Sequence, residues 1–169
     1  MVVEGSLVGA GSAGAPVVLT SLRDDSVGGA TDGEGGTPPA PNDYNGLRVS
    51  GAGVVSLSDA VIRYAQDAVL LQNGGASVFL DRVTIEQVTS GVRTSDSLGY
   101  GSIDVSNSVI RGRGASVGSG IVIHSVAAED LTVTNTEITD FLYGINVSGE
   151  VQLVSNSSMF ARVGGEFRA

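Results

Sequence analysis

The chain has 169 residues, enough for one domain and too few for two ordinary ones. Its 18 acidic residues outnumber 9 basic residues, all arginine, and the net charge of −9 argues against a nucleic-acid or anionic-membrane partner. Cysteine is absent and there is one histidine, which excludes disulfides, thiolate catalysis and metal sites built from cysteine or several histidines. No apolar run is long enough for membrane insertion.

The N-terminal residues 1–5 lack the basic segment and apolar stretch of a signal peptide. The chain is then either cytoplasmic, or a mature form or an excised piece of a secreted protein. We expect the second, with a location outside the cell or on its surface. Residues 5–22 contain two short β-prone segments, Gly5–Val8 and Pro16–Ser21, with a Gly-Ala-Gly at 9–11 between them. This pattern predicts a first rung of a repeat fold.

An insertion of roughly residues 23–45 separates this rung from the next. It is rich in glycine and acidic residues and contains Pro38, Pro39 and Pro41, so its composition predicts a loop. A loop of this length within a compact domain is usually functional or disordered.

From residue 46 onward one pattern recurs five times. Each copy opens with a small residue before a short β-prone segment, and the openings are Gly46, Ala68, Gly91, Gly120 and Gly144. A second segment follows in each copy and contains two aliphatic columns and one bend column. The first aliphatic column is Leu57, Leu80, Val105, Val133 and Val154, and the second is Ile62, Ile85, Ile110, Ile138 and Met159. The bend column is Asp59, Arg82, Asn107, Asn135 and Asn156.

Side chains alternate between apolar and polar along these segments, as in β-strands with one buried face. A unit of about 23 residues cannot bury its own apolar face, but parallel stacking of like units buries it and aligns equivalent side chains about 4.8 Å apart. The pattern therefore predicts an all-β fold, a single-stranded right-handed parallel β-helix (β-solenoid) of about six rungs, as a single domain over 1–169. An antiparallel β-sandwich is the alternative, but it would not repeat the same residue class at the same place in five units.

Parts of the insertion resemble a known family. Leu19–Asp25, Gly28-Gly29 and Pro41–Gly46 are similar to a segment of bacterial secreted and surface proteins with right-handed parallel β-helix repeats, the pectin-lyase-like superfamily in the broad sense. In that family the loop often has a calcium-type Asp-Thr-Asn-Gly-Asp-Gly sequence and a tryptophan before its last glycine. Here residues 30–35 read Ala-Thr-Asp-Gly-Glu-Gly, so Ala30 replaces the first acidic residue, and Tyr44 stands at the tryptophan position.

Two sets of side chains are candidate sites. Ca²⁺ takes six to eight oxygen ligands, and the loop carboxylates that could supply some of them are Asp24, Asp25, Asp32, Glu34 and Asp43. The second set would bind an acidic polysaccharide, because guanidinium groups pair well with carboxylates. It comprises Arg48, Arg63 and Arg93, which we expect to face a groove together with Asp81. The alternative for Arg63 is a role in stability, as part of a surface column of ion pairs with Glu86 and Arg111.

Catalytic signatures are weak. The Gly-His-Gly and Arg-Ile-Lys motifs of β-helix polygalacturonases are missing, and His124 is expected outside, in a column with Ser95 and Ser148. The sequence therefore favours a non-catalytic structural or adhesive module of an extracellular bacterial protein, with Ca²⁺ in the loop as its only predicted cofactor. Its predicted partners are neighbouring domains of a longer chain, or a second copy joined end to end. The alternative is a carbohydrate-active or carbohydrate-binding protein, a polysaccharide lyase or glycoside hydrolase if it is an enzyme.

Overall fold

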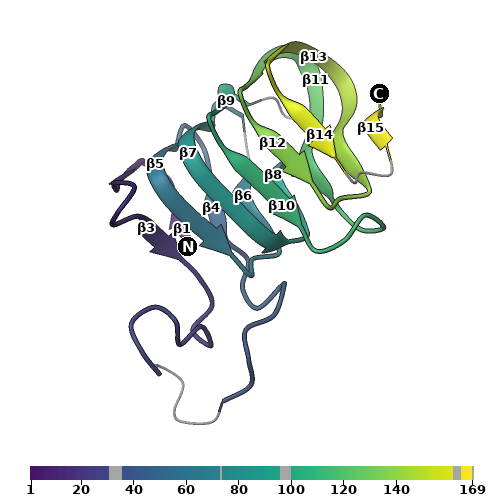
Figure 1. The fold of residues 1–169 in the computed structure, drawn as a ribbon. Helices are drawn as coiled ribbons and strands as arrows, with labels where there is room; N and C mark the ends of the chain where they lie inside the picture. Colours follow the sequence, from purple (N-terminus) through teal and green to yellow (C-terminus); the bar gives the residue numbers. More distant parts are fainter. Residues whose placement is uncertain (31–35, 73, 96–99, 162–164, 169) are drawn as a thin grey trace.

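The structure is a computed structural model that describes residues 1–30, 36–72, 74–95, 100–161 and 165–168. Within them the chain is all-β, without a helix, and every pairing between named strands is parallel. The strands stack as a parallel β-solenoid (Figure 1). Strands of the near side run downward and those of the far side upward while the chain advances from left to right, so the winding is right-handed (Figure 1). The predicted fold class is confirmed.

Three faces of stacked strands surround the core, and longer strands bend from one face into the next. Face 1 contains β1 (Val2–Val3), β4 (Leu47–Val49), β6 (Asp67–Leu71), β8 (Ser90–Thr94), the first parts of β11 (Ser119–Thr134) and β13 (Tyr143–Asn156), and β15 (Gly165–Arg168). Face 2 contains β2 (Ser6–Ala10), the first parts of β5 (Val54–Arg63) and β7 (Ser77–Val88), β9 (Ser102–Ser106), and the second parts of β11 and β13. Face 3 contains β3 (Val17–Leu19), the second parts of β5 and β7, β10 (Val109–Gly112), β12 (Glu137–Thr139) and β14 (Met159–Ala161).

The predicted number of rungs needs a correction. The solenoid has about four full turns, those that begin at β4, β6, β8 and β11, and each has a neighbouring turn on both sides. The windings formed by β1–β3 and by β13–β15 are terminal, and much of their described backbone has a neighbour on one side only. The count of six included these terminal windings as full rungs.

The aliphatic columns form the core. Leu80 pairs in register with Leu57 below it and with Val105 above it, and Val105 pairs with Val133. The side chains of all four are buried. On face 3 the same holds for Ile62, Ile85, Ile110 and Ile138.

The last member of each predicted column is wrong by one residue. Val133 pairs with Ser155, and Val154 points outward with 58% of its surface exposed. Likewise Ile138 pairs with Phe160, which packs against the core, while Met159 is exposed. Because side chains alternate along a strand, a slip of one residue moves every side chain to the opposite face.

The bend between faces 2 and 3 uses left-handed backbone. Positive φ angles occur at Asp59, Arg82, Asn107 and Asn135, as the bend column predicted, and then at Ser157 in place of Asn156. Asn and Asp adopt this conformation more readily than other residues with a side chain, because their short polar side chains can bond locally.

Hydroxyl side chains, which are buried at Ser108 and Thr136, complete this bend. Ser108, Thr136 and Ser158 each directly follow a bend residue, and each accepts the backbone N–H of the preceding turn, with Ser108 Oγ at 3.0 Å from Val83 N. The hydroxyls also donate to backbone carbonyls, Ser108 to Ser106 and Thr136 to Thr134. The left-handed residue interrupts the ladder of backbone bonds, and these side chains satisfy the donors that would otherwise be buried without a partner.

Candidate functional site

The insertion leaves the solenoid after β3 and lies below it in the view of Figure 1. Asp24, at its beginning, is buried and lies 2.6 Å from the guanidinium of Arg63 at the end of β5. Thr20 and Ser26 also donate hydrogen bonds to the Asp24 carboxylate, at 2.5 and 2.7 Å. Burial opposes ionisation, but these hydrogen bonds and the charge of Arg63 outweigh it, so the pKa of Asp24 lies below its ordinary value.

Asp43 holds the other end of the insertion in a similar way. Its carboxylate accepts hydrogen bonds from the Ser21 hydroxyl at 2.7 Å, from the backbone N–H of Ala40 and from the guanidinium of Arg23, both at 3.1 Å. The hydrogen bond from Ser21, helped by those from Ala40 and Arg23, outweighs burial and lowers the pKa of Asp43. Asp24 and Asp43 therefore fasten the base of the loop as ionised carboxylates.

Further contacts connect the insertion to later turns. The Tyr44 hydroxyl donates to the carbonyl of Leu19 at 3.0 Å, and burial raises the pKa of Tyr44 to about 12. Thr89, more than a turn away, donates to the side chain of Asn42 at 2.8 Å. The described ends of the insertion are thus fixed on the solenoid.

The structure gives no contact between members of the predicted calcium set among the described residues. Asp24 and Asp43 are each paired with an arginine, and Asp25 is exposed. Asp32 and Glu34 lie outside the described residues. Among the described residues, no three His, Cys, Asp or Glu side chains gather where they could hold a metal ion. The calcium site stays a prediction.

The three predicted ligand arginines do not converge. Arg48 and Arg93 lie in one outward column of face 1, with Leu70 between them, and Arg93 is 3.5 Å from the buried carboxylate of Asp67. Arg63 ends β5 and binds Asp24. It pairs in register with Glu86, 3.8 Å away, and Glu86 pairs with Arg111, so the predicted alternating column is present.

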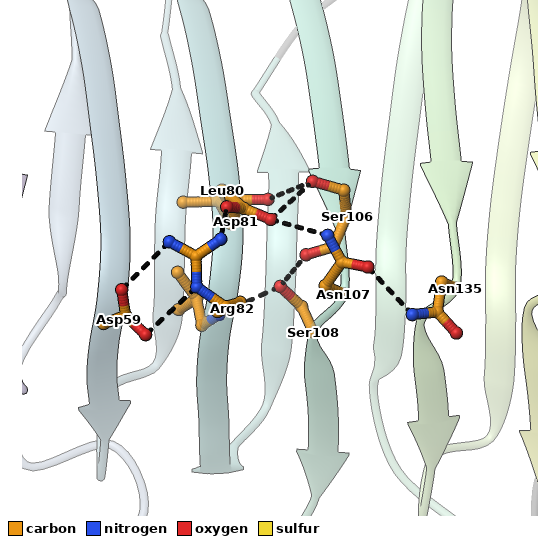
Figure 2. A network of polar contacts seen from close by, with 9 residues as sticks. Asp59, Leu80, Asp81, Arg82, Ser106, Asn107, Ser108 and Asn135 are labelled. Atoms are coloured by element: carbon orange, nitrogen blue, oxygen red, sulfur yellow. Dashed lines mark hydrogen bonds and ion pairs between the residues drawn. The ribbon is translucent and has the colours of Figure 1, made fainter. Parts of the chain in front are cut away.

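A ladder of polar side chains runs along the solenoid over the bend between faces 2 and 3 (Figure 2). The guanidinium of Arg82 binds both carboxylate oxygens of Asp59, at 3.1 and 3.0 Å, and also Asp81. Asn107 donates to Asp81 at 2.7 Å, and Asn135 donates to Asn107 at 2.8 Å. The ladder links four successive turns. The sequence identified Asp59, Arg82, Asn107 and Asn135 only as bends, and Asp81 as a residue of the candidate ligand site.

Beside this ladder face 2 has a shallow hollow of about 200 Å³. It is lined by Phe79, Asp81, Asp104 and the hydroxyls of Ser56, Ser58 and Ser106, among others. The hydrogen bond from Asn107, with those from Ser106 and Arg82, outweighs desolvation and lowers the pKa of Asp81. An aromatic ring that is 40% exposed beside two carboxylates could contact a polar ligand, although no sequence motif marked Phe79.

The single histidine lies on the outside, as predicted. Its Nδ1 is 2.5 Å from the hydroxyl of Ser148, the residue opposite it on β13. No Asp or Glu is paired with His124 in the described part of the chain, so the pair lacks the third group that orients a catalytic base.

The Asp24–Arg63 contact gives a testable expectation. Asp24→Asn should lower the free energy of unfolding at neutral pH by about 1 kcal/mol, since it removes a charge-assisted hydrogen bond. The lowered pKa means that ionised Asp24 stabilises the fold above the unfolded-state pKa of about 3.9 and that this stabilisation is lost as the pH falls through the folded-state value. Denaturant unfolding at neutral and acidic pH measures this difference.

Asp25→Asn is the matched control, because Asp25 is the exposed neighbour on the same loop. It should leave stability unchanged at both pH values. Equal stability of the two variants at neutral pH, or a defect of Asp24→Asn that persists in acid, would contradict the assigned role.

In comparisons with known proteins, no family model, curated protein or solved structure matches the chain. No described helix is long and apolar enough to cross a membrane.

Proposed function

We propose that the chain is a non-catalytic structural or adhesive module of an extracellular or cell-surface bacterial protein, and that its solenoid is of the pectin-lyase-like type. The observation that carries this proposal is the use of charged side chains to connect neighbouring turns. Arg82 binds Asp59, Arg93 lies beside Asp67, and Arg63 approaches Glu86. Side chains committed to such pairs stiffen a scaffold and are not available to attack or protonate a substrate.

Asp81, one of the two carboxylates at the hollow, does not suit the acid role in glycoside hydrolysis. That chemistry needs one carboxyl group with a raised pKa as the acid and a second one as base or nucleophile. Asp81 has a lowered pKa, and its two oxygens accept bonds from Arg82, Asn107 and Ser106. A carboxylate held ionised in this way is a poor general acid.

The extracellular setting is supported by composition. The chain has no cysteine or lysine and carries a net charge of −9. A strongly acidic surface keeps a repetitive β-rich protein soluble and opposes unspecific association, because copies repel one another. The stacked sheet faces offer the extended contact area that an adhesive or spacing module needs.

Incubation with uronic-acid polymers tests the proposal. We expect no new unsaturated or reducing ends, because Asp81 is held ionised by its hydrogen bonds and is a poor proton donor. Product formation that is lost in Asp81→Asn and kept in Asp25→Asn would contradict the non-catalytic proposal and favour the hollow at Phe79 as an active site.

Binding of an acidic polysaccharide without cleavage is the second candidate. The observation in its favour is the outward column of face 1, where Arg48 makes no ion pair with any described residue and Arg93 lies two turns further along the axis. A polyanion lying along the axis would meet both guanidinium groups. Arg48→Ala should then weaken binding to immobilised polyuronate. Arg82→Ala, at the bend between faces 2 and 3, should leave binding unchanged.

A further inference from the structure

Face 2 differs from the other faces in its charge. Among the described residues, its outward carboxylates are those of Asp81, Asp104 and Asp130. The described arginines lie elsewhere: Arg48, Arg93 and Arg168 on face 1, Arg63 and Arg111 on face 3, and Arg23, Arg82 and Arg113 in loops and bends. A surface that carries charge of one sign attracts ligands of the opposite sign and raises their local concentration.

Phe79 provides an apolar surface within the hollow of this face. It pairs in register with Ser56 on one side and with Asp104 on the other, and all three residues line the hollow. The ring is 40% exposed, and no other large apolar side chain of the described strands β4 to β10 is exposed in this way. The strand ladders therefore hold an accessible aromatic ring directly beside a carboxylate.

The two carboxylates of the hollow differ in their partners. Asp81 accepts hydrogen bonds from Ser106 and Asn107 and pairs with Arg82 (Figure 2). The Asp104 carboxylate makes no hydrogen bond or ion pair with another residue that the structure describes. Asp104 is therefore the charge of the hollow that a ligand can neutralise.

A guanidinium group suits this combination of ring and carboxylate. It is planar, so it can stack on an aromatic face while it donates two hydrogen bonds to a carboxylate, and it is less strongly hydrated than an ammonium group. The protein itself contains such a combination, where Arg63 lies over the ring of Tyr64 at 5.7 Å and pairs with Asp24. An anionic ligand would be repelled, and a neutral one would cover Asp104 without pairing its charge, which costs free energy.

We propose that the hollow at Phe79 binds an arginine side chain from a basic segment of another protein, with its guanidinium group stacked on Phe79 and paired with Asp104. The hollow measures about 200 Å³. Pockets for drug-sized molecules begin at about 300 Å³, so this one suits a single side chain. The hydroxyls of Ser56 and Ser58, which also line it, can accept further hydrogen bonds from the incoming segment. This inference does not rest on the proposed function, because a module can bind such a segment whether or not it cleaves polyuronate.

Amide NMR spectra recorded during titration with an acetylated and amidated peptide of alternating arginine and serine test the proposal. The signals of Ser56, Phe79 and Asp104 should shift, and a lysine–serine peptide of equal length should bind more weakly at the same salt concentration. Equal affinity for the two peptides, or equal shifts at acidic residues outside the hollow, would show unspecific attraction and would overturn the proposal. So would the same shifts caused by cellohexaose or by higher protein concentration alone, which would assign the hollow to a neutral glycan or to a second copy.

Three variants locate the contact. Phe79→Leu keeps an apolar side chain but removes the ring, and should weaken binding of the arginine peptide by about two- to fivefold. Asp104→Asn keeps the shape of the side chain but removes its charge, and should weaken binding by a similar factor. Asp130→Asn is the matched control, because it makes the same change of charge on the same face, on the next turn and outside the hollow.

The control variant should therefore weaken binding less than Asp104→Asn does. Neither Phe79 nor Asp104 belongs to the buried core, so the variants should fold, and circular dichroism checks this. Unchanged binding in Phe79→Leu, or an effect of Asp104→Asn no larger than that of Asp130→Asn, would contradict the assigned contact.

Discussion

Leu80→Ala should lower the free energy of unfolding by about 2 to 5 kcal/mol, the usual range for removing a large aliphatic side chain from a packed core. Leu80 is 2% exposed and is stacked between Leu57 and Val105, one turn below and one turn above. The side chains above and below it are fixed by the ladders of both turns, so the cavity cannot close easily. Denaturant unfolding with an unchanged m-value measures the effect.

Two matched Val→Ala variants separate the effect of burial in the column from the effect of the substitution itself. Val105→Ala removes two methyl groups from the buried column, and we expect a loss of about 1.5 kcal/mol or more. Val154→Ala makes the same change at an exposed position and should alter stability by less than about 0.5 kcal/mol. Equal losses in the two variants would mean that Val154 belongs to the core and that the last winding has another register.

Gly46→Ala should destabilise the protein by about 3 kcal/mol, from two separate causes. Gly46 has a φ of +72°, a conformation that residues with a side chain rarely adopt. In addition, a Cβ at this position would overlap the backbone carbonyl of Asp67 on the next turn. Backbone atoms held in a strand ladder cannot move aside without breaking pairs, and thermal or denaturant unfolding should register the full effect.

Gly51→Ala separates the two causes. Gly51 also has a positive φ, +60°, but a Cβ there would meet no atom within 4 Å. Its replacement should therefore destabilise the protein by only about 1 kcal/mol, from backbone conformation alone. A loss at Gly51 as large as that at Gly46 would show that close packing of turns at Gly46 contributes nothing.

The repeat predicted most of the fold because a solenoid places the same demand on every turn. Each turn needs an aliphatic residue at the same inward place, and Leu57, Leu80, Val105 and Val133 meet that demand in the structure. The bend column was predictable for a similar reason, since Asn107 and Asn135 tolerate the left-handed backbone that the corner requires.

The last winding was misplaced because its local signals conflict. Asn156 matched the asparagines of the bend column, yet the left-handed residue is Ser157. Leu153 and Val154 are adjacent aliphatic residues, so alternation alone fits either register. Pairing with β11 decides between them, placing Leu153 opposite Leu131 and Val154 opposite Thr132.

Little of the candidate site was predictable in its details. Asp24 was assigned to a metal, and Arg63 to a ligand or an ion-pair column, because the sequence does not show that the insertion folds back on the end of β5. The two hydrogen bonds from Arg82 to the carboxylate of Asp59 were not predicted, because both residues were identified only as bends. The two side chains come close in space only because one turn stacks on the next. Contacts between an insertion and a repeat depend on where the loop closes, which no periodic pattern encodes.

The register of neighbouring turns can be measured directly by methyl nuclear Overhauser effects in a protein with labelled leucine and valine methyl groups. The parallel stack predicts contacts from Leu80 to Leu57 and to Val105, and from Val105 to Val133, each joining residues one turn apart. Val154 should show no contact with Val133, because Ser155 lies opposite that residue. Contacts that instead pair successive segments in antiparallel order would contradict the solenoid and everything built on it.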